Sequence, residues 1–433
     1  MENNRPQWTS YVSFLIATIG SAVGLGNIWR FPYIMGKNGG AVFLFTYLAI
    51  IAFVCIIPLC VELAIGKTYR GDAITCLEKI NPKFSWLGYI CLLTVIIIPC
   101  FYFVVCGWIL NYIWLYLINS VPTDFSLYFP QLNSNPYVPI ILTWSFLFLA
   151  SIFPFRGLNN GVEKANNIMM PLFAVMLIIL AVYACTLSGT KEGLEFMFLP
   201  DFSKFGKTTI LSALGQALFT LSVGMGAMIT YGSYLKKEVN IKRSAYTLIF
   251  FDTIVALLAG IMIFPIVFSS GIEPTAGPTL VFISLPQIFS NLPCSNLLAL
   301  IFFFLLFFAA ITSAISMMET AVSSFIDKFN MSRQKATFIL SVIIAFLSIP
   351  AALSFGPLAD FKVFDMTFFD LFDHITSNIL LPFNTLIISI IGGWFAHNVS
   401  KEAFGETFFG KVLIFLLRFV VPFALICGLV LGF

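Results

Sequence analysis

Residues 19–32, Ile-Gly-Ser-Ala-Val-Gly-Leu-Gly-Asn-Ile-Trp-Arg-Phe-Pro, decide the fold of this 433-residue chain. They lie inside the first long apolar stretch, yet three glycines fall within seven positions. Each glycine weakens a helix by about 1 kcal/mol relative to alanine. A second apolar stretch contains residues 220–226, Thr-Leu-Ser-Val-Gly-Met-Gly, and repeats the pattern Val-Gly-x-Gly. The sequence therefore predicts two helices that are interrupted in their middle.

The composition around these stretches is that of a polytopic membrane protein. Hydrophobic residues make up 59% of the chain, charged residues make up 10%, and the mean hydropathy is +0.98. A typical soluble domain has about 25% charged residues. This composition excludes a soluble enzyme, a nucleic-acid-binding protein, a disulfide scaffold and a disordered chain. A membrane enzyme is also disfavoured, because the two histidines, His374 and His397, belong to no metal-binding motif.

Apolar runs separated by polar breaks predict an all-α protein with eleven membrane spans, each needing about 20 residues. The predicted spans are 10–36, 40–66, 86–118, 137–154, 166–187, 208–234, 244–269, 294–325, 335–353, 371–396 and 409–432. Most of the 23 Lys and Arg residues fall on one side of this map. The positive-inside rule then predicts a cytoplasmic N-terminus and an outer C-terminus in the cell (inner) membrane.

The interrupted spans, the first and the sixth, each begin a run of five spans, and the two runs have opposite orientations. This arrangement predicts one transporter domain, 1–433, built from inverted repeats at 1–190 and 205–398, with an eleventh helix at 399–433. Unwound backbone in hydrocarbon is tolerated where it faces a cavity or a ligand. Its carbonyls can bind Na⁺, and its N–H groups can bind a carboxylate. Close packing of small residues is the alternative explanation for either break alone.

Further residues extend the first break into a longer set of motifs. They are Ser21-Ala22-Val23-Gly24-Leu25-Gly26-Asn27, Trp29-Arg30-Phe31-Pro32, Asn38-Gly39-Gly40, Pro58-Leu59 with Glu62, Gln216 with Phe219-Thr220-Leu221-Ser222, and Phe308-Ala309-Ala310-Ile311-Thr312-Ser313. Together they resemble the neurotransmitter:sodium symporter family over nearly the whole chain. The resemblance implies a LeuT-type fold and sodium-coupled uptake by alternating access, in a protein of bacterial type.

The resemblance implies one or two bound Na⁺ ions and no organic cofactor. The residues implied for the first sodium site are Ala22, Asn27, Thr220 and Asp252, and those for the second are Gly20, Val23, Ala309, Thr312 and Ser313. All would bind through oxygen atoms. Glu62 is expected to brace the unwound first span by accepting backbone N–H bonds.

The implied substrate is an amino acid. The substrate-binding residues are expected to be Ala22, Gly24, Leu25, Gly26, Ile98, Tyr102, Phe219, Thr220, Ser222, Met225, Ser313 and Met317. Family members that carry monoamines have Asp at the position of Gly24, so the substrate here should supply its own carboxylate. Ile98, Met225, Ala314 and Met317 carry no charge and predict a roomy pocket for Tyr, Phe, Trp, Leu or Met. Core filling by the two methionines is the alternative.

The resemblance also implies two gates. Arg30, Asp373 and Gln216 are expected to close the outer side, with Phe219 as a lid, and Arg5, Asp327, Trp8 and Tyr234 are expected to close the inner side. A carboxylate at Asp252 predicts transport without chloride, with proton counter-transport as a further hypothesis.

An amino-acid-sensing receptor on the same scaffold and a channel are the competing interpretations. Besides the amino acid and the lipid bilayer we expect no nucleic-acid partner, and the chain should be a monomer or a weak dimer.

Overall fold

The computed structural model describes residues 5–271 and 280–431, and all its long elements are helices. The ends of the predicted domain, residues 1–4 and 432–433, lie outside the described residues. Nine continuous segments in the described part are long and apolar enough to cross a membrane. They are α3–η2–α4 (Ala41–Tyr69), η3–α6 (Pro82–Leu117), α8 (Val138–Arg156), η4–α9 (Leu158–Ala184), α13 (Ile241–Ser269), α15 (Ser295–Phe329), α16 (Arg333–Ala352), α17–η7–α18–η8 (Phe368–Phe395) and α20–η9–α21 (Phe408–Val430).

The first and sixth predicted spans are the two that are broken. The first consists of α1 (Tyr11–Ala22) and a segment Gly26–Lys37, formed by η1 and α2, which is bent by 47° from α1. The sixth consists of α11 (Lys207–Thr220) and α12 (Ala227–Ser233), with residues 221–226 unwound between them. In the described part of the chain, nine continuous segments and the bent first span correspond to ten of the eleven predicted spans, and α11 with α12 occupies the place of the sixth. The predicted all-α membrane fold class is thereby confirmed.

Backbone conformation explains where the sixth span breaks. Ser222, Gly224 and Gly226 have φ values of 54°, 89° and 78°, in the left-handed region that glycine adopts without steric cost. A helix cannot continue through such residues. The break in the first span has no positive φ. There Val23 is extended, with φ −75° and ψ 98°.

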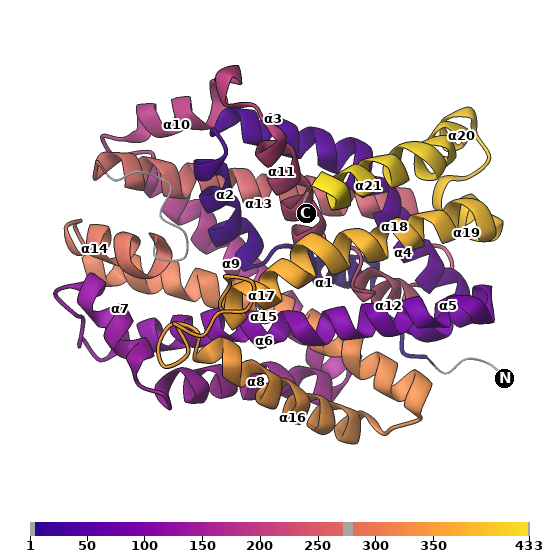
Figure 1. Cartoon of the computed structure of the whole chain (residues 1–433), viewed down its shortest axis with the longest axis horizontal. Coiled ribbons are helices and arrows are strands. Elements are labelled where there is room, and N and C mark those ends of the chain that lie inside the picture. Colours follow the sequence, from indigo (N-terminus) through magenta and orange to yellow (C-terminus); the bar gives the residue numbers. More distant parts are fainter. Residues whose placement is uncertain (1–4, 272–279, 432–433) are drawn as a thin grey trace.

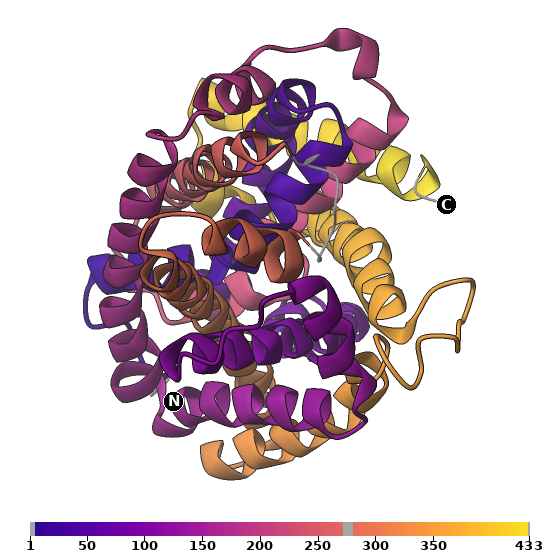
Figure 2. The ribbon, with the colours of Figure 1, turned by 90° about the vertical axis from the view of Figure 1, so that its left-hand side faces the viewer.

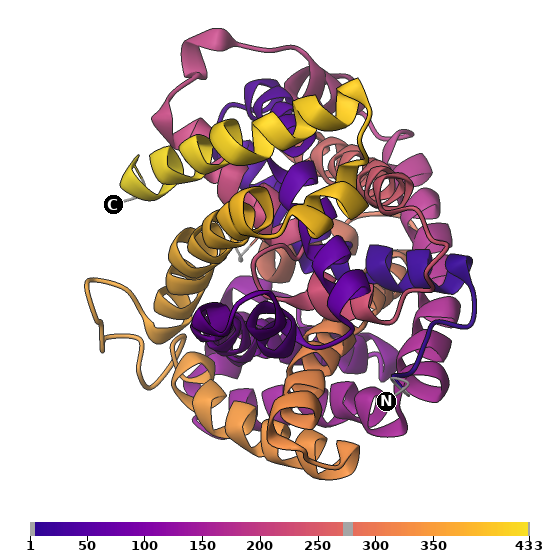
Figure 3. The same ribbon diagram turned by 90° about the vertical axis from the view of Figure 1, so that its right-hand side faces the viewer.

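The two broken helices lie in the middle of the bundle. In Figure 1, α1 and α12 lie at its centre, with α6 and α15 running alongside them. Three short helices lie at the left end of that view and are seen from outside in Figure 2: α7 (Phe125–Ser134), α10 (Thr190–Phe198) and α14 (Leu285–Ser290). The sequence analysis predicted no helices there. The N-terminal segment lies at the opposite end (Figure 3), with α5 (Ala73–Ile80) and α19 (His397–Phe404).

Candidate functional site

The two breaks enclose a small cavity in the centre of the molecule. Its lining contains every predicted substrate-binding residue except Leu25, together with Ser21, which was not predicted. The volume is about 20 Å³, which is space for about one water molecule. The predicted roomy pocket is therefore wrong for this conformation, because the flexible side chains of the lining fill the space themselves.

The polar end of the cavity is formed by the first break. The Leu25 N–H donates to the Tyr102 hydroxyl at 3.4 Å, and the Gly24 N–H donates to Asn27 Oδ1 at 3.3 Å. A Cβ atom on Gly24 would lie 2.4 Å from Ser313 Oγ. Any side chain at this position would therefore displace the Ser313 hydroxyl. The cavity thus offers N–H and O–H donors, and the break carries no carboxylate of its own.

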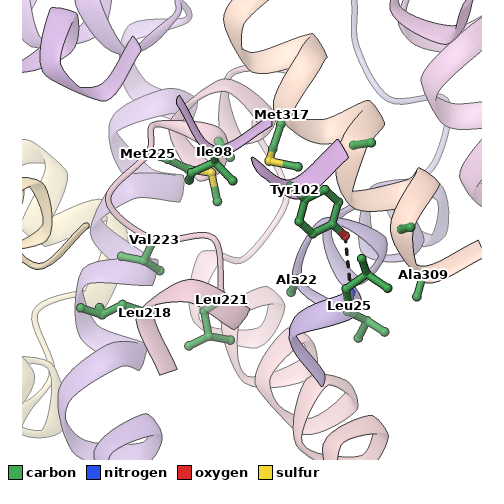
Figure 4. Packing of buried hydrophobic residues seen from close by; sticks show 14 of the residues in the cluster. Ala22, Leu25, Ile98, Tyr102, Leu218, Leu221, Val223, Met225, Ala309 and Met317 are labelled. Carbon is green, nitrogen blue, oxygen red and sulfur yellow. Dashed lines mark hydrogen bonds between the residues drawn. The ribbon is translucent and has the colours of Figure 1, made fainter. Parts of the chain in front are cut away.

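The other end of the cavity is apolar. Ile98 from α6, Met225 from the second break and Met317 from α15 converge there (Figure 4). All three are at most 5% exposed. Methionine has three rotatable bonds and a polarisable sulfur, so it adapts to side chains of different shape. This end suits a neutral hydrophobic group.

A cluster of oxygen atoms lies beside the polar end and contains three of the four residues of the predicted first sodium site. Thr220 Oγ1 lies 2.9 Å from Asn27 Oδ1 and 3.0 Å from Asp252 Oδ1. The amide of Asn27 also donates to Asp252 Oδ1 at 2.8 Å. Asp252 is fully buried, and Tyr47, which sequence reasoning missed, donates to its second carboxylate oxygen at 3.4 Å. Ala22, the fourth residue, lines the adjacent cavity.

Two of the five residues of the predicted second sodium site, Gly20 and Ser313, are in contact, and two more, Ala309 and Thr312, lie within one turn of Ser313 on α15. Ser313 Oγ donates to the Gly20 carbonyl at 3.2 Å, and Thr312 Oγ1 lies 3.2 Å from the Ala309 carbonyl. The Val23 N–H donates the last helical hydrogen bond of α1, to the Ile19 carbonyl. Val23 is therefore the residue that caps the C-terminal end of α1. The Ser313 hydroxyl therefore faces carbonyls at the end of α1, those of Gly20 and Ser21, and such oxygen atoms are the ligands that a hard cation prefers.

The outer gate residues are in contact. Arg30 Nη2 lies 3.9 Å from Asp373 Oδ1, and Arg30 Nη1 donates to Gln216 Oε1 at 3.1 Å. The guanidinium also lies 4.8 Å from the ring centroid of Phe219. Gln216 in turn donates to the Gly26 carbonyl at 2.8 Å. These contacts tie the residues predicted for the outer gate to the first break.

The inner gate is closed by a denser set of contacts. Arg5 pairs with Asp327, donates to two serine hydroxyls at 2.8 Å and lies 4.9 Å from the ring centroid of Tyr234. Burial lowers the pKa of the Arg5 guanidinium, but Tyr234 and Asp327 more than offset this, so that its pKa is raised. The indole of Trp8 is 2% exposed and donates to the Tyr231 carbonyl. The residues predicted for the two gates are thus in contact with one another on both sides.

Glu62 braces the sixth span and not the first, contrary to prediction. Its Oε1 accepts the Gly224 N–H at 2.7 Å. The reason lies in helix packing: a Cβ on Gly66, one turn further along α4 (Ile56–Tyr69), would lie 1.9 Å from the Ile229 carbonyl of α12. This close approach of α4 to α12 places Glu62 beside the second break. Asn384, which was also missed, donates to the Gly224 carbonyl at 2.7 Å.

Ser21 was the easiest of the missed residues to predict, because it lies within residues 19–32, which contain the first break. Tyr47 and Asn384 lie on the second and tenth predicted spans, outside every motif. Isolated polar residues in membrane helices are a general signal of function or of helix packing. That signal alone does not identify their partners.

Comparison with known proteins gives a consistent result. Residues 5–126 and 132–426 match the model of the sodium:neurotransmitter symporter family. The sodium-dependent transporter YhdH of Bacillus subtilis is 37% identical over 98% of this chain and 97% of its own length. The sodium- and chloride-dependent GABA transporter 2 of Homo sapiens is 26% identical over 90% of this chain and 73% of its own length.

Among solved structures, the crystal structure of MhsT in complex with L-phenylalanine is similar to this chain. It has a TM-score of 0.94 and 40% sequence identity, and the match covers 99% of this chain and 100% of MhsT. The match confirms the predicted LeuT-type fold.

Proposed function

We propose that this chain, which belongs to the sodium:neurotransmitter symporter family and is a multi-pass, sodium-dependent transporter, imports a large neutral amino acid. The proposed substrates are Phe, Tyr, Trp, Leu and Met, carried by alternating access with one or two Na⁺ ions. The proposed topology places the N-terminus in the cytoplasm and the C-terminus outside.

The observation that carries this proposal is the polarity of the cavity between the two breaks. At one end the Leu25 N–H and the Tyr102 hydroxyl are placed to hold a carboxylate. At the other end Ile98, Met225 and Met317 present an uncharged surface. A zwitterion with a hydrophobic side chain satisfies both ends. The phenylalanine bound in MhsT has this chemistry.

Sodium coupling follows from the positions of the two oxygen clusters. Each cluster takes ligands from the first span and from a helix outside it: Asn27 with Thr220 and Asp252, and Gly20 with Ser313. A cation bound at either place would fix the broken first span against its neighbours. It would thereby build the substrate site, which explains how an ion gradient can drive uptake. The two gates then open in turn.

We further propose that transport needs no chloride. Asp252 supplies a fixed negative charge beside Asn27 and Thr220. A sodium ion in a low-dielectric interior needs such a counter-charge. In a carrier that lacks this carboxylate, a bound anion can serve the same purpose. Protonation of Asp252 on the return step would add proton counter-transport.

Uptake into proteoliposomes tests the proposed substrate class. Labelled phenylalanine should accumulate above its equilibrium level when an inward sodium gradient is applied, and unlabelled Tyr, Trp, Leu and Met should compete. A receptor would bind the label without accumulation, and a channel would only equilibrate it. Strong competition by Gly or Glu, with none by Tyr, Trp or Leu, would refute the proposed pocket.

Replacement of chloride tests the role of Asp252. Uptake by the unaltered protein should be the same in chloride and in gluconate. Asp252→Asn keeps the shape of the side chain but removes its charge, so uptake should acquire a chloride requirement or lose sodium affinity. If Asp252→Asn transports without chloride and with unchanged sodium affinity, Asp252 does not have this role.

A further inference from the structure

A groove on the lipid-facing surface lies outside the transport site. It runs between α8 and α16 and has a volume of about 640 Å³, which is within the range of about 300–1,000 Å³ found for small-ligand sites. Phe148 on α8 and Phe338 on α16 contribute to its lining and are 69% and 68% exposed. The groove therefore opens to the membrane.

The polar groups of the groove have partners within the protein. Ser151 and Ser341 lie 2.8 Å apart across it, and Ser151 also donates to a carbonyl of its own helix. The indole of Trp144 donates to the Ala345 carbonyl at 3.0 Å, which joins α8 to α16. Because these groups are satisfied, the lining calls for an apolar occupant.

One end of the groove is basic. Arg156, the last residue of α8, belongs to its lining. Arg333 at the start of α16 donates to the Pro154 carbonyl at 3.2 Å, and this contact brings Lys335 to the same end of the bundle. Arg333 itself pairs with Glu319. Arg156 and Lys335 are exposed, and neither forms a hydrogen bond or ion pair with any residue that the structure describes.

The length of the groove matches one membrane leaflet. Its lining on α8 extends from Trp144 to Arg156, which is about 18 Å along a helix at 1.5 Å per residue. One leaflet contributes about 15 Å of the hydrocarbon core. A chain with its headgroup at Arg156 would therefore reach Trp144 near the middle of the membrane.

We propose that this groove is a binding site for one anionic phospholipid. An acyl chain lies between α8 and α16, and Arg156 and Lys335 hold the phosphate. The basic end of the groove is the end for which the sequence predicts a cytoplasmic location, so the lipid would come from the inner leaflet. An uncharged or zwitterionic lipid lacks the net charge that this end complements.

Fluorescence quenching at Trp144 tests the proposal. The full chain is reconstituted in phosphatidylcholine vesicles that contain a small fraction of lipid with brominated acyl chains, either phosphatidylglycerol or phosphatidylcholine. The signal of Trp144 is the difference between the unaltered protein and Trp144→Phe. Two basic residues, at about 1 kcal/mol each, predict that phosphatidylglycerol occupies the groove about 30-fold more readily than phosphatidylcholine.

Three variants define the outcome. Arg156→Gln with Lys335→Gln should abolish the preference, and Val342→Phe, which narrows the groove, should reduce quenching by brominated phosphatidylglycerol. Lys83→Gln with Lys237→Gln removes the same charge from two exposed residues that do not line the groove and should leave the preference intact. Sodium-driven uptake shows that each variant is folded.

Two results would overturn the proposal. One is equal quenching by the two brominated lipids, or a preference that survives the loss of Arg156 and Lys335. The other is quenching that falls as the protein-to-lipid ratio rises, because this would show that a second copy of the chain covers the groove.

Discussion

Replacing Tyr102 by phenylalanine should weaken substrate binding and leave the fold intact. Tyr102 lies on α6 and is 4% exposed, and its hydroxyl lies 3.4 Å from the Leu25 N–H. That hydroxyl is placed to donate to the substrate carboxylate in the proposed complex. The variant keeps the aromatic ring and removes only this donor.

The expected magnitude follows from the charge of the partner. A hydrogen bond to an ionised group contributes about 1.5–3 kcal/mol, which corresponds to a change of about 10- to 150-fold in the dissociation constant. The bond between Tyr102 and Leu25 is long and links neutral groups, so its loss should cost the ligand-free protein much less. The effect should therefore appear in substrate affinity and not in thermal stability.

A second tyrosine of the same helix provides the control. Tyr116 is 3% exposed, and its hydroxyl has no hydrogen-bond partner among the described residues. Tyr116→Phe removes the same atom from the same helix, so binding of labelled phenylalanine at saturating sodium should not change. Equilibrium binding to purified protein measures both variants, and sodium-driven uptake gives the corresponding KM.

A small effect would refute the reasoning. If Tyr102→Phe lowers affinity by less than about threefold, or by no more than Tyr116→Phe does, the hydroxyl does not hold the carboxylate. The proposal that the polar end of the cavity binds the substrate carboxylate would then be wrong.

Gly24→Ala should lower sodium affinity by about tenfold. The added Cβ would lie 2.4 Å from the Ser313 hydroxyl and displace it, and such overpacking costs about 1–3 kcal/mol. Sodium titration of substrate binding measures the affinity, and an unchanged value would contradict the prediction. Glu62→Leu should destabilise the protein by about 1–3 kcal/mol, because it leaves the Gly224 N–H of the second break unpaired. Glu62→Gln keeps an acceptor for this N–H. Thermal unfolding compares the two variants, and equal unfolding temperatures would show that Glu62 does not stabilise the break. Arg5→Ala should open the inner side of the protein. The thiol of Cys76, which is buried near Arg5, should then react severalfold faster with a maleimide. An unchanged rate would show that Arg5 does not hold the inner gate closed.

Several features of the fold and site could be predicted because they depend on local physics. Hydropathy alone delimits the membrane spans, since water is absent from the bilayer core. The position of the second break follows from Gly224 and Gly226, both of which adopt positive φ. The resemblance of the first-span motif to the family then implies a place for Gly24 at the cavity and for Asn27 in the oxygen cluster beside it, and the structure puts both residues there.

The remaining features depend on how helices pack against one another. The sequence shows a buried carboxylate at Glu62 but cannot tell which of two breaks it faces, because the approach of α4 to α12 at Gly66 decides this. The size of the cavity was also beyond prediction. It depends on the rotamers of Met225 and Met317, and an unbranched side chain with three rotatable bonds can adopt several.

The contacts made by the residues proposed for the two gates differ in strength, so the two sides should open with different frequency, while the sodium gradient sets the direction of net transport. On the outer side, Arg30 and Asp373 are 3.9 Å apart and the Asp373 side chain is 35% exposed, and such pairs contribute about 0–1 kcal/mol. Arg30 adds one hydrogen bond, to Gln216, and lies against the Phe219 ring. On the inner side, Arg5 has an ion pair and two hydrogen bonds to hydroxyls, and Trp8 donates two more hydrogen bonds, each of which contributes about 1 kcal/mol. In the absence of ligand the outer gate should therefore open far more often than the inner one. In the proposed cycle, sodium and the amino acid would then reach the empty site mainly from outside, which suits uptake driven by a higher sodium concentration on that side.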